Sequence, residues 1–173
     1  MKEQLLGGSI DITKNVQSLR MSILSVYEPE HTNHYISIQE AIINNIPNTD
    51  SWQSNITPSA SSSIDKQPVS GLTDNQYELT GDYVFNTGWC NGESNPPNAN
   101  ESLWFQLDFT DPIDLNTLDL IEGLTWPGYS FSPRFIINAN LYVSQDKTKY
   151  SLLKAIRNAP TDYTQVAVVR HYP

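Results

Sequence analysis

The chain has 173 residues, a formal net charge of -9 and a sequence pI near 4.6. This length allows one compact domain with an appendage and excludes two full catalytic domains. The 19 acidic residues against 10 Lys and Arg repel phosphate backbones, so we expect no nucleic-acid partner.

Neither export by the common route nor insertion into a membrane is expected. Residues 1–8 (MKEQLLGG) lack the basic start, the apolar run and the small-residue cleavage site of a signal peptide. No apolar run approaches the roughly 20 residues that cross a bilayer as a helix. The single Cys90 excludes an internal disulfide and a multi-Cys zinc site, and we expect it to be a packed thiol.

The first segment with an apolar pattern is compatible with two kinds of element. Ile10 and Ile12 alternate with polar residues, as in a strand. Val16, Leu19 and Ile23 recur at near-helical spacing. The pattern leaves a strand, a helix or both in turn open.

A short helix is predicted next. Ser37 can cap it, Glu40 stands three residues later as in a capping box, and apolar residues follow over 41–46. Pro47 would end the helix.

A polar stretch over 48–63 then reads as a linker that runs into a first strand. We therefore expect the main domain to begin near Asn55. The chain would divide into an N-terminal docking arm, 1–54, and a β-domain, 55–173.

The rest of the chain consists of short extended runs separated by turn residues. This spacing, with almost no helical periodicity, predicts an all-β antiparallel sandwich. In one run, the four apolar residues at alternate positions share one face. They are Leu103, Phe105, Leu107 and Phe109. The runs cover 77–80, 102–109, 115–122, 135–144, 150–156 and 165–172.

Four ordered segments carry a family resemblance. A serine-rich stretch, 59–63, precedes DYVFNTGW at 82–89, and LWFQLDF follows at 103–109. This order resembles the discoidin, or coagulation-factor type C, group of galactose-binding-like jelly rolls, with its D-G-x-x-x-T-x-W and W-[LIF]-Q-[LV]-D-[LF] motifs. Segments 112–120 and 140–146 are similar to later strands of that group.

The chain also departs from the family pattern. Tyr83 stands where the family usually has Gly, and residues 169–173 are not followed by the usual closing strand. We therefore expect that a strand from the arm closes the sandwich or that a neighbouring molecule completes its edge.

The resemblance implies a calcium site and two core aromatics. Many relatives hold calcium in the D…T loop, which carries over to Asp82 and Thr87. The alternative is that both side chains bond locally within a turn. Trp89 and Trp104 correspond to core positions of the family.

A Pro- and Gly-broken loop over 125–134 is the expected ligand site. It holds three aromatic side chains and one cation that could stack on a sugar face or anchor on a protein: Trp126, Tyr129, Phe131 and Arg134. The alternative is a lid on the core. A second loop, 91–100, is rich in amides and is predicted to be a surface connection.

The chain is not expected to be an enzyme. A nucleophilic triad needs a histidine and an acid near Ser or Cys, but His31 and His34 lie in the arm and His171 lies near the end. Glycoside hydrolysis needs two carboxylates at a defined separation, and the sequence gives no reason to pair any two of its acidic residues in this way.

The predicted function is that of a non-catalytic binding module. Its fold would be a discoidin-like jelly roll with an arm that contains a short helix, placed on a virion or phage surface, tail or baseplate, where it binds carbohydrate for adhesion. The alternative is a purely structural virion component whose jelly roll mediates assembly. Glycans or other surface proteins are the expected partners, oligomerisation is expected, and non-classical release to the exterior is the alternative location.

Overall fold

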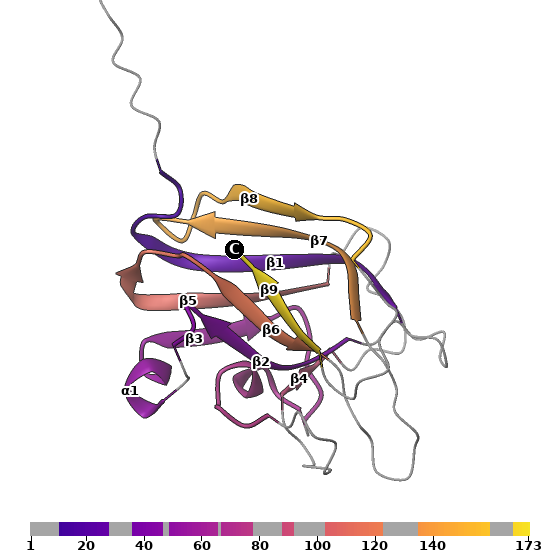
Figure 1. Cartoon of the computed structure of the whole chain (residues 1–173). Coiled ribbons are helices and arrows are strands. Elements are labelled where there is room, and N and C mark those ends of the chain that lie inside the picture. Colours follow the sequence, from indigo (N-terminus) through magenta and orange to yellow (C-terminus); the bar gives the residue numbers. More distant parts are fainter. Residues whose placement is uncertain are drawn as a thin grey trace, which may run out of the picture.

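Two antiparallel β-sheets pack face to face in the computed structural model of the chain (Figure 1). The structure describes residues 11–27, 36–46, 49–65, 67–77, 88–91, 103–122, 135–159 and 168–173. The all-β antiparallel sandwich predicted from the strand spacing is confirmed. In Figure 1, β1 and β7 run across the upper part of the molecule, while β2, β6 and β9 run diagonally below them.

Within the described ranges, the sheets contain five and four strands. The first has the order β3 (Ile56–Ala60), β5 (Leu103–Ile113), β1 (Val16–Tyr27), β7 (Phe135–Ser144) and β8 (Ser151–Ile156). The second has the order β4 (Trp89–Cys90), β2 (Ser37–Ile43), β6 (Leu118–Glu122) and β9 (Val168–Tyr172). Five of the six predicted extended runs contain one of these strands. In the run at 77–80, Tyr77 is not in a strand and the other residues lie outside the described ranges.

The expected division into an arm and a domain does not match the strand pairing. β1 lies in the middle of the five-stranded sheet and pairs with both β5 and β7, while β2 pairs with β4 and β6. Both strands come from the segment predicted as a docking arm, 1–54. The sequence pattern had left strand and helix open for β1, and it is a strand.

The helix predicted from Ser37 is wrong, because this segment is strand β2. The register of β2 against β6 shifts between Ile38 and Glu40. This β-bulge adds one residue to the strand, so Ile38 and Ala41 both reach the core although three positions separate them. A bulged strand thus produces the spacing of a helix face.

Asn44 makes the turn that ends β2. Its φ of 55° lies in the left-handed region, where Asn is tolerated better than most residues. Its Oδ1 accepts hydrogen bonds from the backbone N–H groups of Asn116 (2.7 Å) and Thr117 (3.1 Å), and its Nδ2 donates to Asp114 O (2.7 Å). The side chain ties the end of β2 to the loop before β6.

The core lies between the sheets and is built from the alternating apolar residues of both. The shared face predicted for Leu103, Phe105, Leu107 and Phe109 is confirmed, since all four side chains are buried. Trp89 is fully buried, as the resemblance implied, with its ring centroid 5.9 Å from that of Phe105 in an edge-on contact. Its indole Nε1 donates to Ser62 O at 2.8 Å, which satisfies the one polar group of the side chain.

Two short helical turns flank the sheets. They are α1 (Asp50–Gln53) and the 3-10 turn η1 (Val69–Leu72). No helix in the described ranges is long and apolar enough to cross a membrane.

Candidate functional site

The outer face of the five-stranded sheet carries a row of aromatic and polar side chains on its three central strands. Residues directly opposite one another on neighbouring strands point to the same side of a sheet. β1 places Ser18, Arg20 and Ser22 opposite Asp108, Gln106 and Trp104 of β5, and opposite Ser144, Tyr142 and Asn140 of β7. The alternate residues, such as Leu19 and Met21, point into the core.

Arg20 lies between two aromatic rings on this face. Its guanidinium carbon is 4.7 Å from the centroid of Trp104 and 4.7 Å from that of Tyr150. Both contacts are within the range of a cation–π interaction. The three side chains are half-buried, so the planar guanidinium is held in place at the protein surface.

Trp104 is therefore not a core residue, and the interpretation drawn from the resemblance is wrong at this position. Leu103 and Phe105, its neighbours along β5, are the ones that point inward. Because side chains alternate along a strand, Trp104 must take the opposite face.

Gln106 connects this stack through its amide. Oε1 accepts hydrogen bonds from Arg20 Nε (2.7 Å) and from the Tyr150 hydroxyl (3.0 Å), while Nε2 donates to Asp108 Oδ1 (2.8 Å). The Tyr150 oxygen also lies 2.9 Å from the hydroxyl of the buried Ser18. These contacts fix the orientation of the amide, because both of its ends have a partner of the correct kind.

A second arginine reaches the same face from the end of β8. Arg157 Nη2 donates to Asn140 Oδ1 at 2.7 Å, and Nη1 donates to the carbonyl oxygens of Ala139 and Ile156, both at 2.7 Å. Asn140 Nδ2 in turn donates to the Tyr142 hydroxyl at 3.1 Å. We call the eight side chains joined in these two networks the outer-face cluster: Arg20, Trp104, Gln106, Asp108, Asn140, Tyr142, Tyr150 and Arg157.

The structure does not describe the residues that were predicted as sites. The expected ligand residues Trp126, Tyr129, Phe131 and Arg134, the expected calcium ligands Asp82 and Thr87, and also His31 and His34, are all outside the described ranges. Within those ranges, no three His, Cys, Asp or Glu side chains are grouped so that they could hold a metal ion.

Three other residues singled out in the sequence lie within the described ranges. Cys90 is buried, which confirms the packed thiol. Asn91, the first residue of the amide-rich loop, is buried and its Oδ1 accepts the Ile36 N–H at 3.0 Å. His171 lies on β9 with Nδ1 2.5 Å from Asp119 Oδ1, and it is exposed.

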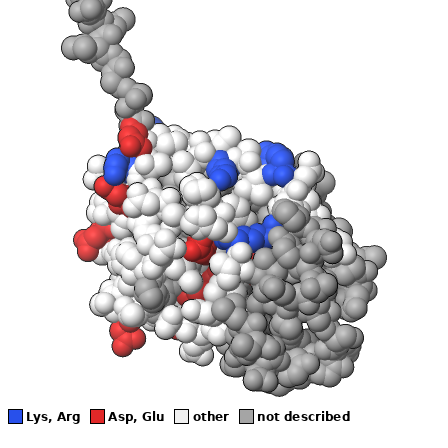
Figure 2. Space-filling model, in the orientation of Figure 1, with Lys and Arg blue, Asp and Glu red and all other residues white. Residues whose placement is uncertain are grey.

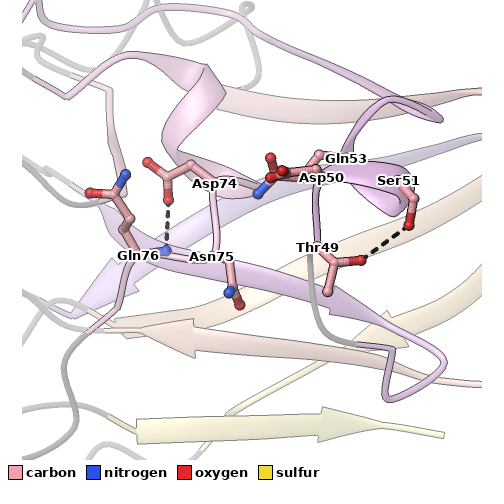
Figure 3. A pocket seen from close by; sticks show the side chains of 7 residues that line it. All are labelled: Thr49, Asp50, Ser51, Gln53, Asp74, Asn75 and Gln76. Atoms are coloured by element: carbon pink, nitrogen blue, oxygen red, sulfur yellow. Dashed lines mark hydrogen bonds between the residues drawn. The ribbon is translucent and has the colours of Figure 1, made fainter.

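An open hollow of about 760 Å³ lies between α1 and the turn at 74–76 (Figure 3). Short polar side chains line it, including Asp50 and Asp74. Burial raises the pKa of Asp74, and its Oδ1 accepts the Gln76 N–H at 3.0 Å. Ligand sites usually combine apolar walls with a few polar groups, so this hollow is a weaker candidate than the outer-face cluster.

An ion pair is buried inside the sandwich at the end of β6. Glu122 Oε2 lies 3.1 Å from Arg170 Nε and accepts the Ile136 N–H at 3.0 Å. Burial raises the pKa of Glu122 to about 7, although Arg170 and the Ile136 N–H act in the opposite direction. Arg170 also lies over the Phe135 ring, 5.6 Å from its centroid. The ion pair joins the neighbouring strands β6 and β9 of the four-stranded sheet, and the Ile136 hydrogen bond links Glu122 to β7 of the other sheet. Both side chains are buried and are not open to a ligand.

Comparisons of the chain with protein-family models, curated proteins and solved structures found no match. The resemblance to discoidin domains therefore remains a prediction. Sequence reasoning missed the outer-face cluster, although a signal was present: Trp104, Gln106 and Asp108 stand at the polar positions of the most regular strand.

Proposed function

We propose that this chain is a non-catalytic carbohydrate-binding module and that the outer-face cluster contacts the sugar. The observation that supports it most is the stack of Trp104, Arg20 and Tyr150 on the face of a sheet, tied to Gln106 by hydrogen bonds. Polar residues are sufficient on the solvent-facing side of an antiparallel sheet. The half-buried aromatic rings on this face are therefore not explained by solubility, and ligand binding would explain them.

The chemistry of the cluster matches the two kinds of surface that a sugar offers. Trp and Tyr have an apolar body and a polar tip, so they can pack on the C–H face of a pyranose ring. Amide, hydroxyl and guanidinium groups donate and accept the hydrogen bonds of sugar hydroxyls. Asn140 and Tyr142 place such groups one strand away from the Arg20 stack.

The cluster is also rigid before any ligand arrives. Its residues lie on the central strands β5, β1 and β7 and directly before and after β8, and hydrogen bonds fix the orientations of Gln106 and Asn140. Preorganised side chains lose less conformational entropy on binding, which favours affinity for a flexible ligand.

We further propose the discoidin-like jelly roll and a role in adhesion on a virion, with the aromatic loop 125–134 as a second contact. One topological observation supports the jelly roll. Among the strands that the structure describes, the connection from β7 to β8 joins neighbours in one sheet, and the other seven connections between consecutive strands cross between sheets. The functional step is an analogy, because a fold does not determine a ligand.

A structural role in a particle is the second candidate, and the edge of the four-stranded sheet favours it. Of the strands that the structure describes, β9 is the outermost on one side of that sheet, and its Val169 is 53% exposed. An exposed edge strand can pair with a strand of another molecule.

A glycan array with the purified chain tests the proposal. The wild type should bind one sugar class, Trp104→Ala should lose that binding, and Tyr77→Ala should keep it. Tyr77 is a matched control, since it is an exposed aromatic residue away from the cluster. Melting curves should show that each variant is folded.

The competing outcomes are distinct. Loss of binding in Trp126→Ala but not in Trp104→Ala would place the site in the loop and overturn the outer-face proposal. A silent array together with an oligomer in light scattering would favour the structural role.

A further inference from the structure

We propose that the ligand of the outer-face cluster is an acidic saccharide whose carboxylate or sulfate group is bound by Arg20, with Arg157 as a second cationic contact. This inference rests on the proposed function and specifies its substrate class. It goes beyond sugar stacking because it assigns the charge of the ligand.

The hydrogen bonds of Arg20 leave its outer end available. Nε donates to Gln106 Oε1 at 2.7 Å, and no described residue accepts a hydrogen bond from Nη1 or Nη2. The two rings on either side prevent the guanidinium from swinging away. Its terminal N–H groups form a fork that matches the two oxygens of a carboxylate or sulfate.

The segment that leads from the β7–β8 turn through β8 is cationic although the whole chain is acidic. Residues 147–159 (KTKYSLLKAIRNA) contain Lys147, Lys149, Lys154 and Arg157 and no Asp or Glu, whereas the chain has a net charge of -9. In Figure 2, blue side chains lie along the upper part of the molecule, where Figure 1 places β7 and β8. An acidic ligand would thus approach a locally favourable edge of the five-stranded sheet.

The carboxylates near the cluster already have partners. Asp108 Oδ1 accepts the Gln106 Nε2–H at 2.8 Å. Asp146 Oδ1 accepts the backbone N–H groups of Thr148 and Lys149, both at 2.8 Å, within its own turn. These hydrogen bonds hold the pKa of Asp146 well below its usual range. Neither carboxylate forms a hydrogen bond or an ion pair with Arg20, so neither competes with a ligand for the guanidinium.

Two pairs of polymers that differ only in charge test this inference. Polygalacturonic acid is compared with its methyl ester, and dextran sulfate with dextran, so that the carboxylate and sulfate sources are separated. Titration calorimetry of the full chain should give at least one acidic polymer an affinity about tenfold or more above its neutral partner, as charged hydrogen bonds allow. High salt should reduce this preference.

Variants of Arg20 show whether this residue causes the preference for acidic polymers. Arg20→Gln should remove the preference, and Arg20→Lys should restore only part of it, since Lys lacks the planar fork. Lys14→Gln is the matched control, because it removes a cation that pairs with Asp114 away from the cluster. Arg157→Gln, at the exposed end of β8, should weaken acidic binding and gives a second test if Arg20→Gln does not fold.

Each failure has its own reading. Equal affinity for acidic and neutral polymers, or a preference that survives the Arg20→Gln and Arg157→Gln double variant, would overturn the acidic-ligand inference and leave carbohydrate binding in place. Absence of binding to any glycan would overturn the proposed function and this inference with it.

Discussion

Gly71 and Gly88 touch backbone to backbone: a Cβ atom on Gly71 would lie 2.5 Å from the carbonyl oxygen of Gly88. Gly88 itself has a φ of +79°, and a Cβ there would lie 2.4 Å from Ile38 O. The two glycines therefore let η1 approach the start of β4 and let β4 approach β2 more closely than side chains permit.

Gly71→Ala should lower the free energy of unfolding by about 1–3 kcal/mol, because backbone rather than a flexible side chain must move. Urea denaturation of the two proteins measures the difference. Ser70→Ala, an exposed neighbour in η1, should change it by less than about 0.5 kcal/mol. Equal stability of Gly71→Ala and wild type would show that η1 can shift at no cost.

Replacing the two sequence-motif tryptophans should have unequal effects on stability. Trp89→Ala removes a fully buried indole and should cost about 3–5 kcal/mol, while Trp104→Ala should cost about 1 kcal/mol, since Trp104 is half-buried on the outer face. Denaturant titration of both variants compares them. Similar losses would mean that Trp104 contributes to the core after all.

Glu122→Gln should change how stability depends on pH. The carboxyl has a pKa near 4.5 in the unfolded chain and about 7 in the folded one. Between these values the folded state holds a proton that the unfolded state has released, so the wild type loses stability as pH rises. The loss relative to Glu122→Gln should be roughly 3 kcal/mol across this window.

Urea denaturation at several pH values between 4.5 and 7 checks the Glu122 prediction. The exposed Ser70 provides a control that removes no titratable group, and Ser70→Ala should follow the wild-type curve. Parallel curves for wild type and Glu122→Gln would contradict a raised pKa at this site.

Asn44→Ala should destabilise the fold by about 2 kcal/mol, because it removes three side-chain hydrogen bonds and a residue suited to positive φ. The adjacent Asn45, with a φ of 57°, separates the two effects. Asn45→Ala loses the same conformational preference without those three bonds and should cost less. The midpoint of thermal unfolding is sufficient to rank the variants.

β5 could be predicted because its apolar residues alternate without interruption from Leu103 to Phe109. β1 and β2 could not, because their buried apolar residues also recur at three-residue spacing. In β1, the register against β5 shifts between Val16 and Ser18, and both Val16 and Leu19 are buried. In β2, a bulge made Ile38 and Ala41 resemble a helix face.

The candidate site escaped prediction for a different reason. Arg20, Trp104 and Tyr150 come from three distant parts of the chain, and only the pairing of β1 with β5 and β7 brings them together. The alternation of residues along one strand predicts which side of the sheet Trp104 faces. It does not predict which side chains of other strands lie beside it. Sequence motifs instead drew attention to local clusters, such as the aromatic loop 125–134.

The central position of β1 also sets the order in which the molecule can be completed. Arg20 meets its β5 partner Gln106 across 86 residues of sequence, and β7 follows later still. During synthesis, β1 therefore has no partner strand at either edge until most of the chain has been made. Folding should accordingly be slow for a chain of this size, and a fragment that starts at residue 55 would leave β5 and β7 with an empty place between them.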